Sequence, residues 1–315
     1  MACGKKEEEA KPPSGPIVGV GELPVSLRLT ATAPPDAHEV EISPSEIHVG
    51  SQPLITLAGG NVAAADRQGS EIPKLTAALK SPVRARASFA ISSEVPYETV
   101  ALAISSAKAA GLRGIAFKVR APNSMSTTGF IALDDFSVGP RTKIDEEVAL
   151  SGVVARPWEE FTAHWEDIGN ACRGAQTGSC AYKPEKIATG GHLKIALLAA
   201  GQGVNVNFSQ VGAPPPAEAP KKPKVEMLDG VKKTDIVKDV EEAPPATDAS
   251  FQFRAQEALK VPSPVSEVMK PICGTTACGV VLNGEKNTMF VRVASLLGAA
   301  FPDNTPAPIV QFELP

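Results

Sequence analysis

The sequence predicts an α+β fold made of tandem small two-layer units, each a mixed β-sheet with helices packed on one face. Two observations predict this class: short segments in which apolar and polar residues alternate, and Ala- and Leu-rich segments with apolar residues at helical spacing. A third observation is that these segments recur along the chain in a similar order. The 315 residues are 43% apolar, which suffices for one large core or for several small ones.

Residues 1–22 are expected to form a disordered tether. Lysine, glutamate and proline fill most of this stretch, and such a composition buries too little apolar surface to fold. The opening MACG resembles the end of a bacterial lipobox, in which a cysteine that follows a small residue is lipidated after cleavage. Cys3 is therefore a candidate lipidation site, provided that the true start lies upstream of Met1; the alternative is a free cysteine on a cytosolic tail.

The first unit is expected at residues 23–122. Residues 40–50 predict two strands joined by a tight turn, residues 98–110 predict a helix, and residues 115–119 predict the strand that follows this helix. Proline before the helix presets the backbone for a helix start, and Gly111 after it suits the left-handed conformation of a helix end. The final strand, helix and strand should form a right-handed parallel crossover.

A threefold repeat predicts two further units. Residues 75–119, 165–208 and 268–312 can each be interpreted as helix end, turn, strand, helix and strand. The predicted helices are ETVALAISSAKAA, GHLKIALLAA and MFVRVASLLGAA, all rich in Ala and Leu. We therefore expect these three segments to adopt the same order of elements.

The boundaries between units are predicted from composition. The second unit is expected at residues 129–212 and a more divergent third unit at residues 225–315. Polar residues at 121–129 and a Pro-rich stretch at 213–224 are typical of linkers between such units.

The five cysteines predict two disulfides. Cys172 and Cys180 are close in the sequence, as are Cys273 and Cys278, and both pairs fall at the turn between a helix end and the next strand. Cys3 remains as the single thiol. The spacings do not match those of structural zinc sites, so no metal is expected. Paired cysteines favour an oxidising compartment, with reduced thiols in a cytosolic protein as the alternative.

One cluster of acidic residues and histidine is a candidate catalytic or metal site. Glu160, His164 and Asp167 would share one face of a helix at residues 158–167. Polar residues opposite an apolar stripe are also what any amphipathic helix has, so no catalytic residue, metal or cofactor is predicted. The stripe on this helix consists of Trp158, Phe161, Trp165, Ile168 and Cys172.

One segment of the first unit resembles a known family. Val95, Pro96 and Tyr97 open the predicted helix, Gly111 closes it, and Gly-Ile-Ala-Phe at 114–117 begins the last strand. With the hairpin, helix and strand before it, this order resembles the periplasmic domain of the ExbD/TolR biopolymer-transport family. The resemblance implies a periplasmic module of the cell envelope that binds envelope proteins or peptidoglycan.

The chain departs from this family at its membrane anchor. Family members are anchored by an N-terminal transmembrane helix that carries an aspartate used in proton-driven force transfer. No stretch of this sequence approaches the roughly 18 apolar residues that a spanning helix needs, so energy transduction is not expected. A lipid on Cys3 would be the only membrane attachment.

The sequence thus predicts a non-catalytic accessory or scaffold protein of the cell envelope. A periplasmic or outer-membrane lipoprotein location is expected, with the cytoplasm as the alternative. The net charge of −4, from 31 basic and 35 acidic residues without a basic stripe, disfavours nucleic acid as a partner. The alternative function is a periplasmic ligand-binding protein with a cleft between units.

Overall fold

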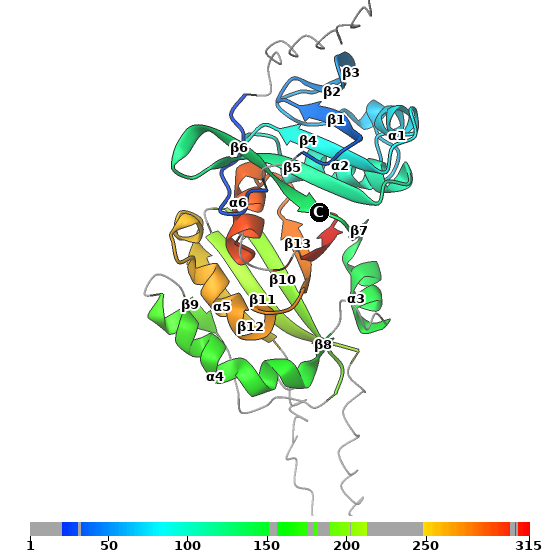
Figure 1. The fold of residues 1–315 in the computed structure, drawn as a ribbon. Coiled ribbons are helices and arrows are strands. Elements are labelled where there is room, and N and C mark those ends of the chain that lie inside the picture. Colours follow the sequence, from blue (N-terminus) through cyan, green and yellow to red (C-terminus); the bar gives the residue numbers. More distant parts are fainter. Residues whose placement is uncertain are drawn as a thin grey trace, which may run out of the picture.

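The computed structural model describes residues 21–30, 33–150, 156–175, 179–181, 190–201, 203–212, 248–302, 306 and 308–315. Within these ranges the chain forms two mixed sheets and six α-helices, which confirms the expected α+β class. The sheets belong to two units that lie one above the other, the first at the top of Figure 1. No helix of the described ranges is long and apolar enough to span a membrane. The predicted tether and the Pro-rich linker lie almost entirely outside these ranges.

The first unit is a six-stranded sheet in the order β3-β2-β1-β4-β5-β6. The three strands β1, β4 and β5 are parallel to one another, and the remaining pairs are antiparallel. The elements are β1 (Ala37–Ile42), β2 (Glu46–Val49), β3 (Gln52–Thr56), α1 (Pro73–Leu79), β4 (Arg86–Ile91), α2 (Tyr97–Ala109), β5 (Gly114–Ala121) and β6 (Ser124–Leu133).

The local sequence explains the predicted part of this unit. Ala87, Phe89 and Ile91 alternate with partly exposed residues along β4, so one face of the sheet is apolar and meets the helices. Pro96 precedes α2 with φ −65°, and Gly111 after it has φ +88°, a conformation that side chains rarely adopt. The helix start and end predicted at these residues are confirmed.

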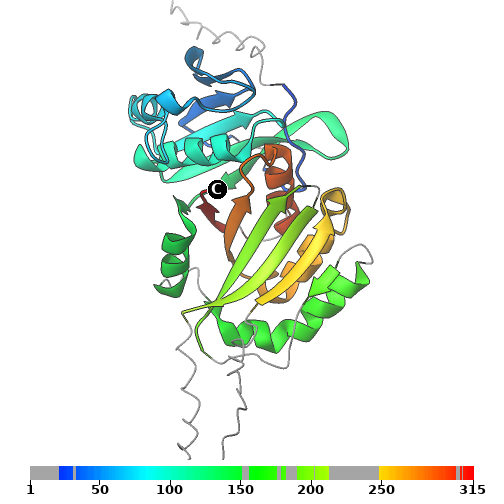
Figure 2. The ribbon, with the colours of Figure 1, turned by 180° about the vertical axis from the view of Figure 1, so that it is seen from behind.

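The second unit is an eight-stranded sheet in the order β7-β14-β13-β10-β11-β12-β9, with β8 paired to β10. Seen from behind, β10 and β11 lie in front of α4 and α5 (Figure 2). The elements are β7 (Phe136–Gly139), α3 (Arg141–Leu150), β8 (Arg156–Pro157), α4 (Trp158–Gly174), β9 (Ser179–Ala181), β10 (His192–Ala200), β11 (Gly203–Val211), β12 (Asp248–Arg254), α5 (Pro264–Cys273), β13 (Gly279–Gly284), α6 (Phe290–Ala300) and β14 (Ile309–Glu313).

The sheet corrects the expected division of the chain. Strands from the predicted second unit, 129–212, and third unit, 225–315, are hydrogen bonded together, because β10 pairs in parallel with β13. The stretch at 121–129 is no linker either, since it forms the tip of the hairpin between β5 and β6. Pairing between distant strands overrides the boundaries that local composition suggests.

Residues 191–200, whose Ala and Leu content predicts a helix, form a strand instead. They form β10, in which Leu193, Ile195, Leu197 and Ala199 are buried at every second position. This alternation has the period of a strand, although the Ala and Leu content is typical of a helix. The segment at 165–208 therefore lacks the order of elements that the other two segments share.

The fold nevertheless repeats, twice and not three times within the described residues. The series β1, β2, β3, α1, β4, α2, β5 has the same order and the same neighbours in its sheet as β10, β11, β12, α5, β13, α6, β14. The registers correspond, since Val40 lies opposite Phe89 in the first sheet as Leu197 lies opposite Leu282 in the second. We call these two series the first and second copy.

The two copies share one core. The rings of Phe117 on β5 and Phe312 on β14, which are equivalent residues of the copies, lie 6.1 Å apart. The ring of Phe290 at the start of α6 lies 5.4 Å from that of Phe117. One contiguous cluster of buried side chains therefore runs through both copies.

Candidate functional site

The family-like residues lie at the junction between the copies. Pro96, before α2, and its equivalent Met289, before α6, form an antiparallel bridge. The Tyr97 amide donates to the Thr288 carbonyl at 2.8 Å, and the Phe290 amide donates to the Val95 carbonyl at 2.9 Å. Each helix start thus satisfies an amide of the other, as in an interface with twofold symmetry.

Tyr97 extends this junction into the second copy. Its hydroxyl lies 3.0 Å from the Leu282 carbonyl and 2.8 Å from the Glu313 carbonyl, and its ring packs on Gly284, where a Cβ would lie 2.8 Å away. Burial and then the charge of Glu313 raise the pKa of Tyr97. The neutral phenol therefore joins the first copy to two carbonyls of the second.

Ion pairs reinforce the junction at the surface. One carboxylate oxygen of Glu98, in the first turn of α2, lies 2.8 Å from Arg67 and 3.2 Å from Lys286 of the second copy. Glu98 also suits a helix N-terminus, where the macrodipole favours negative charge. The junction therefore combines apolar, backbone and ionic contacts.

Both predicted cysteine pairs are within disulfide distance. Cys172 and Cys180 have a Cα separation of 6.1 Å, and Cys273 and Cys278 have one of 5.4 Å. The first bridge joins α4 to β9, and the second joins α5 to the strand that follows it. Cys3, the predicted lipidation site, lies outside the described residues.

The acidic and histidine residues of α4 do not converge. Glu160 binds Arg156 at 2.8 Å, while His164 lies 3.8 Å from Asp167 near the surface. In the described part of the chain, no three His, Cys, Asp or Glu side chains are grouped as metal ligands. The apolar stripe of this helix is buried as predicted at Trp158, Phe161, Ile168 and Cys172.

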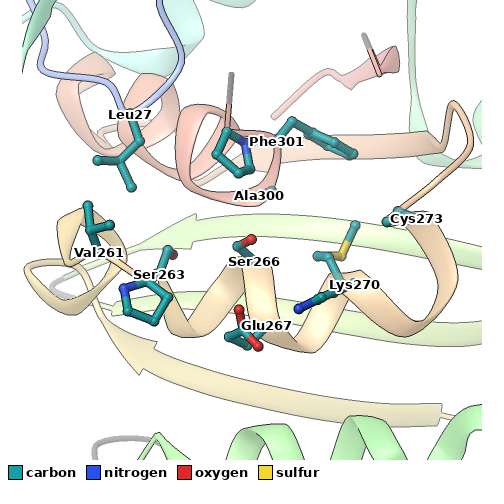
Figure 3. Close-up of a pocket in the computed structure, with 13 residues that line it drawn as sticks. Leu27, Val261, Ser263, Ser266, Glu267, Lys270, Cys273, Ala300 and Phe301 are labelled. Atoms are coloured by element: carbon teal, nitrogen blue, oxygen red, sulfur yellow. The ribbon is translucent and has the colours of Figure 1, made fainter. Parts of the chain in front are cut away.

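A cavity of about 390 Å³ lies between α5 and the C-terminal end of α6 (Figure 3). Leu27, from the N-terminal segment 21–30, closes one side of it. That segment is held at α6 by hydrogen bonds from Ser295 Oγ to the Val25 carbonyl at 2.8 Å and from Arg28 to the Phe301 and Pro302 carbonyls at 3.2 and 3.4 Å. The apolar lining includes Leu27, Val261, Met269, Ala300, Phe301 and Pro302.

Two hydroxyl groups face the gap between the helices. Ser263 and Ser266 project from α5 and its start toward the side that Leu27 and Phe301 form (Figure 3). Ser263 is only 4% exposed, and its Oγ has no hydrogen-bond partner in the described ranges. Glu267 and Lys270 also line the cavity and lie lower along α5 in this view.

Sequence reasoning missed this cavity. The available signal was a serine at 263 and another at 266, three positions apart, beside the buried apolar residues of the same helix. Hydroxyls at helical spacing are unremarkable by themselves, since serine often stands near a helix start. Only the position of the second helix and of Leu27 turns them into a lining.

A second concave surface lies at the outer corner of the first copy. A groove of about 500 Å³ is formed by the starts of β1 and β3, the end of β2 and the end of α1. His38 lines it, is 4% exposed, and has an Nε2 without a hydrogen-bond partner among the described residues. Burial, then the charge of Arg84, lower the pKa of His38, so the ring is neutral at neutral pH.

One exposed apolar side chain, that of Val83, lies next to this groove. Val83, in the loop that follows α1, is 94% exposed and is adjacent in sequence to Pro82, which lines the groove. The neighbouring edge strand β3 contains Pro53, which has no amide hydrogen to offer to an added strand. This corner therefore suits contact through side chains better than extension of the sheet.

Comparison with known proteins finds no matching family model, no similar curated protein and no similar solved structure.

Proposed function

We propose that the protein is a non-catalytic scaffold of the cell envelope that binds envelope proteins or peptidoglycan, as its resemblance to ExbD/TolR periplasmic domains implies. One observation carries the proposal. The resemblance rests on the helix start Val95-Pro96-Tyr97. These residues contact the second copy and join the two copies into a single body, so they are not available to a partner. The outer faces of that body are then the surfaces left for partners.

The cysteines support the location that belongs to this proposal. Two short disulfides would persist in an oxidising compartment such as the periplasm and would be rare in a reducing cytosol. A lipid on Cys3 would tether the body to a membrane through the polar stretch that follows it.

The groove at the outer corner of the first copy is the surface that we assign to partners. It combines a concave surface, a neutral buried histidine and the exposed Val83 at its margin. The exposed Val83 gives a partner in the groove apolar surface to bury. Since Pro53 hinders strand addition at this edge, a partner is expected to contact side chains of β3 and of the loop after α1.

Sedimentation with purified peptidoglycan, and capture of partners from detergent-solubilised envelope fractions, test the proposal in two separate arms. Binding in either arm should fall when Val83→Asp and Leu54→Asp are combined, because both changes place charge at the groove. Val261→Asp is the matched control, since Val261 is 84% exposed but lies on the second copy.

Two outcomes would contradict the scaffold. One is the absence of binding in both arms. The other is binding that the groove substitutions and the control change equally. Free thiols at all five cysteines of protein taken from its native host would separately refute the oxidising compartment.

A further inference from the structure

The first helices of the two copies, α1 and α5, have the same buried stripe. Its residues have the same spacing, Ile72, Leu75, Thr76 and Leu79 in α1 and Val265, Val268, Met269 and Ile272 in α5. Leu75 is therefore equivalent to Val268, and Leu79 to Ile272. Ser263, Ser266 and Lys270 lie on another face of α5.

In the first copy the helix pair is filled by apolar side chains. Ile72, Leu75 and Leu79 are at most 1% exposed, and the Ile72 amide donates to Ser106 Oγ of α2 at 2.8 Å. This is the close packing expected where two helices cover one sheet.

In the second copy Val265, Val268 and Ile272 fill the same three positions. The cavity of about 390 Å³ lies beside another face of α5, and Ser263, Ser266 and Lys270 line it. Its volume is within the range of roughly 300–1,000 Å³ that is usual for ligand pockets.

The lining combines apolar surface with a buried hydroxyl. Ser263 Oγ has no hydrogen-bond partner among the described residues, and a partner at this place is favourable because a buried polar group left unpaired is destabilising. The rest of α5 keeps a continuous buried stripe of Val265, Val268, Met269 and Ile272. The polar positions are therefore confined to the face that meets α6.

We propose that this cavity binds a small amphipathic molecule. Its apolar part would lie against Leu27, Met269 and Phe301, and its polar head would exchange hydrogen bonds with the Ser263 and Ser266 hydroxyls. Lys270 and Glu267 stand at the margin with opposite charges, so the site demands a hydrogen-bonding head and no particular net charge. The inference is independent of the scaffold function, because the groove and Val83 lie on the other copy.

Octanol, octanoate and octylamine are suitable probes, because they combine one apolar chain with a neutral, an anionic or a cationic head. Saturation-transfer NMR and thermal unfolding with the full chain measure their binding. At least octanol should bind and raise the melting temperature with concentration, since a ligand that binds only the folded state stabilises it.

The decisive variant combines Ser263→Ile with Ser266→Leu, which fill the cavity with larger apolar side chains. It should keep its circular dichroism spectrum and weaken octanol binding by about tenfold or more, because the space and both hydroxyls are removed. Ala300→Leu narrows the cavity from the α6 side and should have the same effect if the double variant does not fold. Ser81→Leu, in the groove of the first copy, is the control and should leave binding unchanged.

The proposal is overturned if none of the probes binds. It is also overturned if octanol binds equally to the wild type and to the folded cavity-filling variants, because the chain would then lie elsewhere. Binding that Ser81→Leu removes would place the ligand in the groove of the first copy and would likewise refute the assignment.

Discussion

At the scale of single residues, Tyr97 connects the two copies most directly. Its hydroxyl reaches two carbonyls of the second copy, and its ring lies against Gly284 on β13. The equivalent residue of the second copy is Phe290, which has no hydroxyl. The junction is therefore symmetric in its backbone contacts and asymmetric in its side chains.

Tyr97→Phe should lower the free energy of unfolding by about 1–2 kcal/mol, because it removes a buried hydroxyl that is hydrogen bonded to carbonyls. Urea denaturation measures the loss. Gly284→Ala should also destabilise the protein, since the new Cβ would lie 2.8 Å from the ring of Tyr97.

Gly284→Ala forms a cycle with a third substitution, Tyr97→Leu, which removes the ring. If the ring causes the effect of Gly284→Ala, the alanine should be tolerated better in the Tyr97→Leu background. Equal destabilisation in both backgrounds would show that the backbone of β13, and not Tyr97, rejects the side chain.

His38 predicts a dependence of stability on pH. Its pKa is lowered from 6.5 in the folded state by burial and then by Arg84, so the unfolded chain binds the proton more readily. The stability that neutral His38 contributes is full above the unfolded pKa and is lost as the pH falls through the folded pKa. The melting temperature of the wild type should fall more than that of His38→Gln between about pH 8 and pH 5.

His164→Gln, on the surface of α4, is the control and should behave as the wild type. Glu41 and Glu313, whose pKa values burial raises, act in the opposite direction, and their effect cancels because both proteins retain them. Parallel curves for the wild type and His38→Gln would contradict the assignment.

At the scale of elements, the outer edge of the second sheet is protected by an additional strand. β9 pairs with β12, which would otherwise be the edge, and the disulfide from Cys180 to Cys172 ties β9 to α4. The equivalent strand of the first copy, β3, has no such cover within the described residues. A covered edge resists unwanted pairing with other chains.

Replacing Cys172 and Cys180 by serine should destabilise the protein by about 2 kcal/mol on the chain-entropy model, since the closed loop is short. The largest effect should be local. Amide hydrogen exchange should accelerate more in β9 and β12 than in β1 and β4, whose hydrogen bonds lie in the other sheet. Uniform acceleration in both sheets would refute a local role.

Some elements could be predicted from the sequence and others could not. Pro96 and Gly111 mark the ends of α2 by their own backbone preferences, so a local pattern was sufficient. The strand at 192–200 was missed because Leu and Ala favour helices, whereas its conformation is set by pairing with β11 and β13. The cavity depends on Leu27, Ser263 and Phe301, which come from three distant parts of the chain, so no local pattern contains it.

At the scale of the whole molecule, the shared core predicts cooperative unfolding. Phe117 contacts Phe290 and Phe312, so neither copy can open without exposing apolar surface of the other. Both tryptophans, Trp158 and Trp165, lie on α4, and their fluorescence reports the second unit, which contains the second copy. Circular dichroism reports both copies.

Denaturation curves from the two signals should coincide in the wild type. Phe117→Ala should lower the stability by about 3 kcal/mol or more and, by weakening the coupling between the copies, separate the two curves. Phe251→Ala, a change of the same size inside the second sheet, is the control and should destabilise without separating them. Curves that are already separate in the wild type would show that the copies unfold independently.

The reciprocal bridge between Pro96 and Met289 has a consequence for how the molecule evolves. In a dimer of identical subunits, one gene encodes both sides of such an interface, so every mutation appears twice and every site exists in pairs. Here each side has its own codons and changes alone. Any ligand of the α5 cavity would bind with a stoichiometry of one per chain, and either half can acquire a new specificity while the other preserves the assembly.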